Sequence, residues 1–210
     1  MKKVRLAVIL AGGKGRRMGF KDKAMISLKG KTLIERSLYS LRNQTDCIAI
    51  NCYSYEQCKH ISSNVKICKK FEFISDNLQF KSSGSIGPLA GIYEALIWTE
   101  KKYGKNSYVL TVPVDVPFLP DDLYDRLYYP FKDKKLSISI AKSNGRTHPT
   151  IALWSTSIKN QLRSAIESGI RKIDIFTAPF NKCYVEWNNT KDPFFNINYP
   201  EDLSIANDKI

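Results

Sequence analysis

Short apolar runs alternate with amphipathic stretches along most of the chain. The apolar runs, bounded by turn residues, predict buried strands over residues 6–10, 47–52, 71–75, 107–112, 136–141, 150–154 and 182–186. The amphipathic stretches predict helices over residues 32–43, 55–62, 87–102, 120–129, 157–168 and 171–176, with a terminal helix from residue 200. This alternation indicates an α/β fold with a Rossmann-like, doubly wound, mostly parallel sheet flanked by helices.

Local signals support two helix starts and two loops. Thr32 and Glu35 have the spacing of a capping box. Pro88 suits a first helical turn, where its missing N–H costs nothing. Residues 77–85 are polar without periodicity and predict a mobile loop, whereas residues 142–149 predict a loop between two strands.

The composition is that of an ordinary globular protein with a basic surface. Hydrophobic residues make up 43% and charged residues 25% of the 210 residues, which suits one domain, 1–210. Within it we expect a core over about 1–130 and an elaboration over about 131–198. The formal charge of +13 would suit a nucleic-acid-binding protein, but the basic residues form no run of five or more. A basic solvated surface that attracts anionic substrates is therefore favoured, and no nucleic acid is expected as a partner.

The cysteines and the apolar runs bear on the location of the protein. The five cysteines form no Cys-x-x-Cys pair, which favours reduced thiols in the cytoplasm. No apolar run approaches the ~20 residues that span a bilayer. The first run leads into Gly12 and Gly13 without a small-residue cleavage site, so it is interpreted as a core strand and not as a signal peptide. We therefore expect a cytoplasmic protein without a membrane partner.

A glycine-rich, cationic segment follows the first strand. It contains Ala11, Gly12, Gly13, Lys14, Gly15, Arg16 and Arg17, with Lys23 further along. Glycines allow backbone N–H groups to approach a ligand, so a polyphosphate would fit here. Neither the Gly-x-Gly-x-x-Gly fingerprint nor the Gly-x-x-x-x-Gly-Lys-Ser/Thr loop matches. The alternative is a solvated surface loop.

Asp115 follows the fourth predicted strand. In a doubly wound sheet of order 3-2-1-4, the first and fourth strands are neighbours, and ligands bind beyond their carboxyl ends. This order would bring Asp115 beside the glycine-rich segment. Because Mg²⁺ takes one or two carboxylates together with substrate phosphates, Asp115 is the candidate metal ligand. The alternative is a helix cap or a turn residue before Pro117.

These segments together resemble a known family. Leu10-Ala11-Gly12-Gly13, Arg17-Met18-Gly19 and Asp22-Lys23 are similar to the signature of the molybdenum cofactor guanylyltransferases, a branch of the nucleotidyltransferase superfamily. Further similar segments follow in the same order: Gly87 to Gly91, Asp115 with Pro117, His148 to Thr150, and Asn196 to Asp202. The resemblance spans nearly the whole chain.

The resemblance implies a Mg²⁺-dependent reaction. GMP would pass from GTP to the terminal phosphate of Mo-molybdopterin, with release of pyrophosphate, and molybdoenzymes or cofactor chaperones would be further partners. No general base is required, because the attacking phosphate oxygen is already anionic and the main task is to bring two anions together. Three alternatives remain open: a cytidylyltransferase of the same pathway, a sugar-phosphate nucleotidyltransferase and, more remotely, a basic nucleic-acid-binding module.

The resemblance also implies which residues act. Lys23, Arg17 and Asp115 would be catalytic, with Asp115 also binding Mg²⁺. The contacts to GTP would come from Leu10, Ala11, Gly12, Gly13, Lys23, Asn51, Asp76 and Asp115. Arg17 has an equal alternative as a structural arginine that holds the loop.

The elaboration would supply the acceptor side, where the resemblance points to His148, Asn196 and Asn198. His148 and Arg146 are neighbours in the predicted loop and could both meet a phosphate. The alternative for His148 is a hydrogen-bonded histidine that enters a strand. His60 is interpreted as a surface or core residue.

Overall fold

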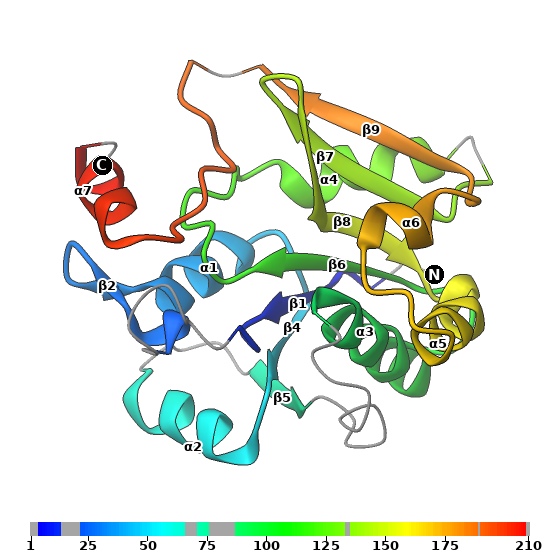
Figure 1. Ribbon diagram of the computed structural model, residues 1–210, viewed down its shortest axis with the longest axis horizontal. Coiled ribbons are helices and arrows are strands. Elements are labelled where there is room, and N and C mark those ends of the chain that lie inside the picture. The colour runs from blue at the N-terminus through cyan, green and yellow to red at the C-terminus, as the bar shows by residue number, and fades with distance from the viewer. Residues whose placement is uncertain are drawn as a thin grey trace.

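A seven-stranded sheet forms the centre of the protein, whose computed structural model describes residues 4–13, 22–65, 71–75, 87–132, 135–188 and 190–208. Its strands lie in the order β5 (Phe71–Ser75), β4 (Cys47–Cys52), β1 (Leu6–Leu10), β6 (Tyr108–Pro113), β8 (Arg146–Ser155), β7 (Ile138–Ser143) and β9 (Lys182–Trp187), as Figure 1 shows. The first four are parallel to one another and have the predicted order 3-2-1-4. The doubly wound, mostly parallel α/β fold is thus confirmed.

Helices cover both faces of the sheet (Figure 1). One face packs against α3 (Pro88–Tyr103), α5 (Lys159–Glu167) and α6 (Ile173–Thr177), and the other against α1 (Leu33–Leu41), α2 (Tyr55–Asn64), α4 (Leu123–Tyr128) and α7 (Pro200–Asp208). Side chains of a strand alternate between the faces. In β1, Leu6 and Val8 therefore enter the core beneath α3, while Ala7 and Ile9 enter the core beneath α1.

Short elements connect β1 to the first helix. They are a 3₁₀ turn, η2 (Lys23–Met25), and the small hairpin of β2 (Ser27–Leu28) and β3 (Lys31–Thr32). The predicted capping box is present at the start of α1, where Thr32 and Glu35 bind each other's backbone N–H groups. This local signal was therefore sufficient to locate the helix start.

The prediction of a loop over residues 142–149 is wrong. The strand β7 runs to Ser143 and β8 begins at Arg146, so the connection consists of Asn144 and Gly145 alone. Both have positive φ, 48° and 76°, as a type I′ hairpin turn requires. Asn-Gly is itself a strong hairpin signal. Arg146 and His148 consequently lie on a strand and not in a loop.

Two of the predicted helices include residues that form 3₁₀ turns in the structure. The helix expected over 120–129 begins later, at α4, and continues as the 3₁₀ turn η4 (Tyr129–Phe131). The helix expected over 157–168 is preceded by the 3₁₀ turn η5 (Thr156–Ile158). The loop predicted over 77–85 lies outside the described residues.

The sheet reverses direction after β6. The strand β8 is antiparallel to β6 and β7, whereas β9 is parallel to β7. Between the pairs Ile140–Ala152 and Ala141–His148, three residues of β8 (149–151) have no partner in β7. This is a bulge, and Pro149, which lacks an N–H group, lies in it.

None of the helices in the described ranges combines the length and apolar content needed to cross a bilayer. Four of the cysteines, Cys47, Cys52, Cys58 and Cys183, are free thiols, and Cys68 lies outside the described residues.

Candidate active site

The ammonium group of Lys23 lies among three oxygen acceptors. Its Nζ is 2.8 Å from Asp115 Oδ2, 2.7 Å from Asn198 Oδ1 and 3.3 Å from the carbonyl oxygen of Ile197. An ammonium group has three N–H donors, so each donor has an acceptor. Three segments that are far apart in the sequence meet at this one atom.

The residue before Lys23 explains the local structure. Asp22 is the N-cap of η2, and its Oδ1 accepts a hydrogen bond from the N–H of Ala24 at 3.1 Å. Aspartate is among the preferred capping residues, because its carboxylate satisfies an N–H group that the first turn leaves free. In the Asp22–Lys23 pair of the sequence, Asp22 thus caps the turn, and Lys23 is the first residue of the turn.

Asp115 lies at the carboxyl edge of the sheet, beside the end of β1. Leu10 pairs with Pro113 across the two strands, and the Leu10 carbonyl accepts the N–H of Val114 at 3.1 Å. The carbonyl of Asp115 accepts the N–H of Ile197 at 2.9 Å. The structure therefore brings Asp115 beside the start of the glycine-rich segment, as the strand order requires.

The Asp115 carboxylate can offer one oxygen to a metal ion. Oδ2 binds Lys23, whereas Oδ1 is buried and has no hydrogen-bond partner among the described residues. A buried carboxylate oxygen without a partner is unusual, and it suits a hard cation such as Mg²⁺. The described ranges contain no group of three or more His, Cys, Asp or Glu residues that could hold a metal. Mg²⁺ commonly takes most of its ligands from substrate phosphates and water.

The ends of β1 and β4 hold the predicted nucleotide residues together. Leu10 pairs with Asn51, and the N–H of Ala11 donates to the Asn51 carbonyl at 2.9 Å. Gly12 is half-buried and Gly13 is exposed, and among the described residues no atom lies within 4 Å of a Cβ built on Gly13. Within that part of the chain, nothing packs against Gly13 at the start of the glycine-rich segment.

Gly91 explains why α3 comes close to this edge. A Cβ at Gly91 would lie 2.5 Å from Asn51 Oδ1 and 3.0 Å from Leu10 Cδ2. In the sequence, Gly91 belongs to a family segment but had no assigned role. Its position in the interior of a helix was the available signal, since a glycine there usually has a packing reason.

The strand reversal brings the predicted acceptor residues to the same edge. Because β8 is antiparallel to β6, its first residues extend past the carboxyl end of β6: Thr111 pairs with Ala152, and residues 146–151 lie beyond that pair. Arg146 is exposed on this overhang, and His148 is half-buried. The edge that holds Asp115 thus also holds the start of β8.

His148 belongs to a hydrogen-bonded chain with Ser143 and Asp192. Ser143 Oγ lies 2.8 Å from His148 Nε2 and donates to Asp192 Oδ1 at 2.7 Å. Because the single hydroxyl proton goes to the carboxylate, Nε2–H of His148 is the donor to Ser143. Burial lowers the pKa of the His148 imidazole, the nearby Asp192 carboxylate raises it, and Arg146 lowers it further. The ring is therefore neutral at pH 7.

The segment after Asp192 leads back to Lys23. Asn198, half-buried, binds the Lys23 ammonium, whereas Asn196 is exposed. Asp202, in the first turn of α7, accepts hydrogen bonds from the N–H groups of Asn198 and Tyr199 at 2.8 and 2.9 Å. Asp202 thereby fixes the backbone that carries Asn198. The sequence indicated this aspartate as part of a helix start and of a family segment, without a role in the site.

Arg17 and Asp76, two predicted site residues, lie outside the described residues, as do Lys14 and Arg16. Within the described part, the structure brings together Leu10, Ala11, Gly12, Gly13, Lys23, Asn51, Asp115 and Asn198. The sequence analysis did not single out Ser143 or Asp192.

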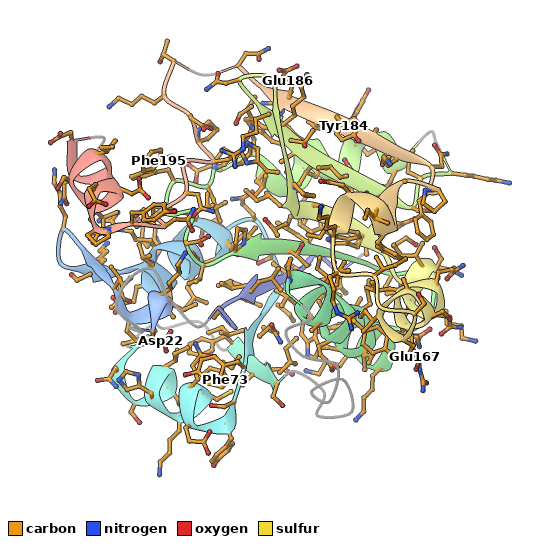
Figure 2. The ribbon with its side chains drawn as sticks, in the orientation of Figure 1. Asp22, Phe73, Glu167, Tyr184, Glu186 and Phe195 are labelled. Atoms are coloured by element: carbon orange, nitrogen blue, oxygen red, sulfur yellow. The ribbon has the colours of Figure 1, made fainter. Side chains whose placement is uncertain are left out.

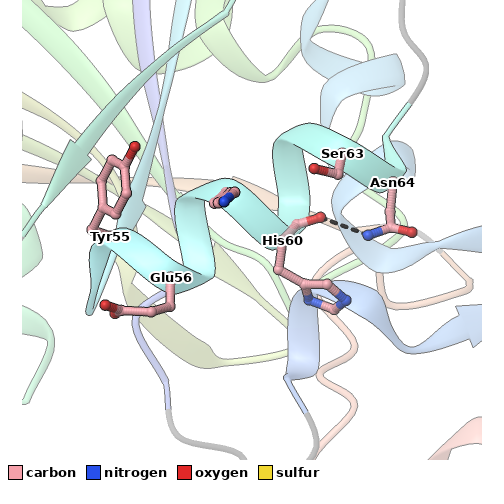
Figure 3. Close-up of a pocket in the computed structure, with 6 residues that line it drawn as sticks. Tyr55, Glu56, His60, Ser63 and Asn64 are labelled. Carbon is pink, nitrogen blue, oxygen red and sulfur yellow. Dashed lines mark hydrogen bonds between the residues drawn. The ribbon is translucent and has the colours of Figure 1, made fainter.

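A surface hollow elsewhere contains none of these residues. It is lined by Tyr55, Glu56, Lys59, His60, Ser63 and Asn64, which all belong to the outer face of α2 (Figure 3). His60, which was predicted as a surface or core residue, lies exposed there, and its carbonyl accepts a hydrogen bond from Asn64 Nδ2 at 2.8 Å.

Known proteins share both the sequence and the fold. A family model described as a MobA-like NTP transferase domain matches residues 7–178. A molybdenum cofactor guanylyltransferase of Rhodopseudomonas palustris is 37% identical over 95% of this chain and 89% of its own length. Another, of Nitrobacter hamburgensis, is 36% identical over 95% of this chain and 91% of its own length.

A solved structure agrees with these relatives. The molybdopterin-guanine dinucleotide biosynthesis protein A of Archaeoglobus fulgidus superposes with a TM-score of 0.76 at 29% identity, and the match covers 97% of both chains. The family model spans most of the chain, and the relatives exceed 30% identity over nearly all of it. The chain therefore belongs to the MobA-like NTP transferase family.

Proposed function

We propose that this protein transfers GMP from GTP to the terminal phosphate of Mo-molybdopterin, forming molybdopterin guanine dinucleotide and pyrophosphate. The relatives described above are named after this activity or after its product. The observation that supports it most directly is the meeting of Lys23, Asp115 and Asn198 where β1 and β6 end. A phosphate-binding cation, a metal-binding carboxylate and an acceptor-side amide are the groups that such a transfer needs.

The reaction is a substitution at the α-phosphorus of GTP. An oxygen of the acceptor phosphate forms the new P–O bond, and the bond to the bridging oxygen breaks, so the electron pair leaves with pyrophosphate. Because the attacking oxygen is already anionic, no side chain has to remove a proton from it. The residues therefore contribute by positioning the two anions and by neutralising their charge.

We assign Mg²⁺ to Asp115, where Oδ1 is the available oxygen. When bound, the ion neutralises charge on the triphosphate. Lys23 would contribute a second cation, and Arg17, from outside the described residues, a third. Leu10, Ala11, Gly12, Gly13, Asn51 and Asp76 would bind the nucleotide.

We assign the acceptor phosphate to the overhang of β8 and to the segment before α7. Arg146 would supply a positive charge, and Asn196 and Asn198 would supply amide donors. Neutral His148 donates through Nε2 to Ser143, so only a protonated ring would donate to the phosphate through Nδ1. The enzyme would act in the cytoplasm, and molybdoenzymes or cofactor chaperones would receive its product.

The test is pyrophosphate release from GTP, CTP, ATP and UTP with Mg²⁺ and Mo-molybdopterin. We expect turnover with GTP as the only active nucleotide, no turnover after chelation of the metal, and turnover on the order of 10²- to 10³-fold lower with the Asp115→Asn variant. Turnover with CTP alone would make the protein a cytidylyltransferase of the same fold. A folded sample without turnover on any nucleotide, but with tight and steeply salt-dependent nucleic-acid binding, would refute an enzymatic role.

A further inference from the structure

Gln57 is a buried side chain on the inner face of α2, with 3% of its surface exposed. Its Nε2 donates to the carbonyl of Ala11 at 3.0 Å and to Asp22 Oδ1 at 2.9 Å. Its Oε1 accepts the N–H of Tyr53 at 3.0 Å. Both donors of the amide and its oxygen therefore have partners, which come from three separate segments.

Two of these partners lie on either side of the glycine-rich segment. Ala11 comes directly before Gly12, and Asp22 comes directly before Lys23. Figure 2 shows Asp22, the cap of η2, beside α2. One side chain thus holds the first residue of the glycine-rich segment and the residue that comes before Lys23.

The bond to Asp22 reaches Lys23 through the cap of η2. The oxygen that Gln57 binds, Asp22 Oδ1, is the same atom that accepts the N–H of Ala24. Hydrogen bonds to an ionised carboxylate are among the stronger ones in proteins. Gln57 therefore orients the capping group of the turn that presents Lys23 to Asp115.

The partners also determine which way the amide points. Rotation of the amide by 180° would bring Oε1 against two oxygen acceptors and the NH₂ group against the N–H of Tyr53. Only a side chain with two donors and one acceptor satisfies all three partners. A leucine side chain has no donor and no acceptor. A glutamate carboxylate at this position would repel both Asp22 and the Ala11 carbonyl.

We infer that Gln57 is a positioning residue for the nucleotide: it holds Ala11, where the glycine-rich segment begins, and Asp22, the residue before Lys23, and thereby sets the place of Lys23. The inference rests on the proposed function and deepens it, because Gln57 belongs neither to the proposed nucleotide contacts nor to the metal site. It predicts an effect on GTP binding that exceeds the effect of an equally buried glutamine elsewhere.

The chain offers such a glutamine. Gln44 is 6% exposed, and its Nε2 donates to the carbonyls of Ser40 and Pro120, both at 2.9 Å. Its Oε1 accepts the N–H of Tyr124 at 3.0 Å. The bonding pattern matches that of Gln57, but it joins the end of α1 to the start of α4. Gln44→Leu is therefore the matched control for loss of a buried amide.

The experiment compares wild type, Gln57→Leu, Gln57→Glu and Gln44→Leu. In Gln57→Leu, the KM for GTP should rise about tenfold, as expected for the loss of one well-placed hydrogen bond. The kcat should fall as well, because the position of Lys23 changes, whereas the KM for the acceptor should stay within about twofold. Gln57→Glu should raise the KM for GTP further, and Gln44→Leu should lower the melting temperature without changing this KM.

A second readout needs neither acceptor nor turnover. Hydrogen exchange of the Ala24 amide, followed in a peptide covering residues 22–32, should be faster in Gln57→Leu than in wild type and unchanged in Gln44→Leu. Equal exchange in wild type and Gln57→Leu would overturn the inference. If Gln57→Leu fails to fold, Asp22→Ala removes the same bond from the other side and should raise the KM for GTP.

The two proposals fail in different ways. A wild-type protein that binds GTP at equilibrium but transfers nothing contradicts the proposed function. The same protein still supports the inference if Gln57→Leu binds GTP about tenfold more weakly. Equal GTP affinities for wild type and Gln57→Leu contradict the inference, whatever the acceptor is.

Discussion

At the scale of single residues, Lys23 and Asp115 depend on each other. Their side chains are only 13% and 15% exposed, so neither charge is fully solvated. Removal of one partner leaves the other as a charge that is largely buried and uncompensated, which costs more than the pair contributes. The residues proposed for chemistry therefore also affect folding.

We predict that Lys23→Met and Asp115→Asn each lower turnover by on the order of 10²- to 10³-fold, because each removes a group that stabilises the developing charge. Lys23→Met should also lower the free energy of unfolding by about 1–3 kcal/mol. The double variant should recover stability but not activity. Urea denaturation and pyrophosphate release measure the two effects.

Lys102→Met is the control for this prediction. Lys102 pairs with Glu72 at the surface, where the two side chains are 41% and 43% exposed, so its loss should cost at most about 1 kcal/mol. Full turnover by Lys23→Met would exclude the proposed role of this lysine.

Gly91→Ala tests the close approach of α3. The new methyl group would meet Asn51 Oδ1 and Leu10 Cδ2, so these two side chains must shift. We expect weaker GTP binding and a loss of about 1–3 kcal/mol of stability from overpacking, offset in part by the better helix propensity of alanine. Titration of GTP and thermal melting report the two effects.

The added variant Asn51→Ala gives the control for Gly91→Ala. If the clash is the cause, Gly91→Ala should destabilise the Asn51→Ala protein less than it destabilises the wild type. Additive losses would show that another contact is responsible.

The sequence predicted some of the site and not the rest, for physical reasons. The place of Asp115 beside the end of β1 was predictable, because parallel strands end at one edge of the sheet, whereas Leu10 and Asn51 were assigned through the family resemblance. The bond between Lys23 and Asn198 was not, because it joins residues 175 positions apart through a segment without periodicity. Gln57 gave no signal, since a glutamine that faces inward on a short helix looks like any polar residue.

At the scale of elements, local signals were reliable and long-range pairing was not. The capping box located α1, because both of its hydrogen bonds lie within four residues. The strands β7, β8 and β9 were predicted as elements, but their directions and order depend on contacts that the apolar pattern alone does not encode. The pairing of β7 with β8 was an exception that the sequence did indicate. The Asn144–Gly145 turn is typical of a tight hairpin, although the segment was predicted as a loop.

We predict that Thr32→Ala lowers the free energy of unfolding by about 1 kcal/mol, because it removes the N-cap of α1. The KM for GTP should stay unchanged, since Thr32 lies outside the proposed site. Ser63→Ala, on the exposed face of α2 in Figure 3, is the control and should change stability by less than about 0.5 kcal/mol. Chemical denaturation distinguishes the two, and an equal effect of both would refute the cap.

At the scale of the whole molecule, one sheet carries both halves of the proposed reaction. The parallel part (β5, β4, β1 and β6) ends at the nucleotide residues, and the reversed strand β8 begins at the acceptor residues. The division into a core over about 1–130 and an elaboration over about 131–198 remains a prediction, because the sheet is continuous across it. The free energy of unfolding also belongs to the whole molecule. We expect it to depend on pH through His148.

The depressed pKa of His148 predicts a stability that falls in acid. An unfolded histidine binds its proton near pH 6.5, whereas the folded one does so only at lower pH. Between these values the unfolded state holds more protons, so the free energy of unfolding rises with pH. Stability should therefore be lost as the pH falls below about 6.5 and through the folded pKa of His148.

Denaturation curves at pH 7.5, 6.5 and 5.5 measure this slope. His148→Gln should flatten it over this range, because the variant has no imidazole to charge. His60→Gln, on the exposed face of α2, is the matched control and should leave the slope as in the wild type. Identical slopes for wild type and His148→Gln would contradict the assignment.

A change in the length of the β7–β8 hairpin would be a simple way for this fold to accept new substrates. Side chains alternate along a strand with a period of two. The loss of two residues from each strand would therefore shorten the overhang by about 7 Å and leave all the remaining side chains on the same faces of the sheet. Such a change would move Arg146 and His148 relative to Asp115 without altering β1, β4 or the residues that follow them. Acceptor choice could thus diverge by changes of hairpin length, while the nucleotide half of the sheet is inherited intact.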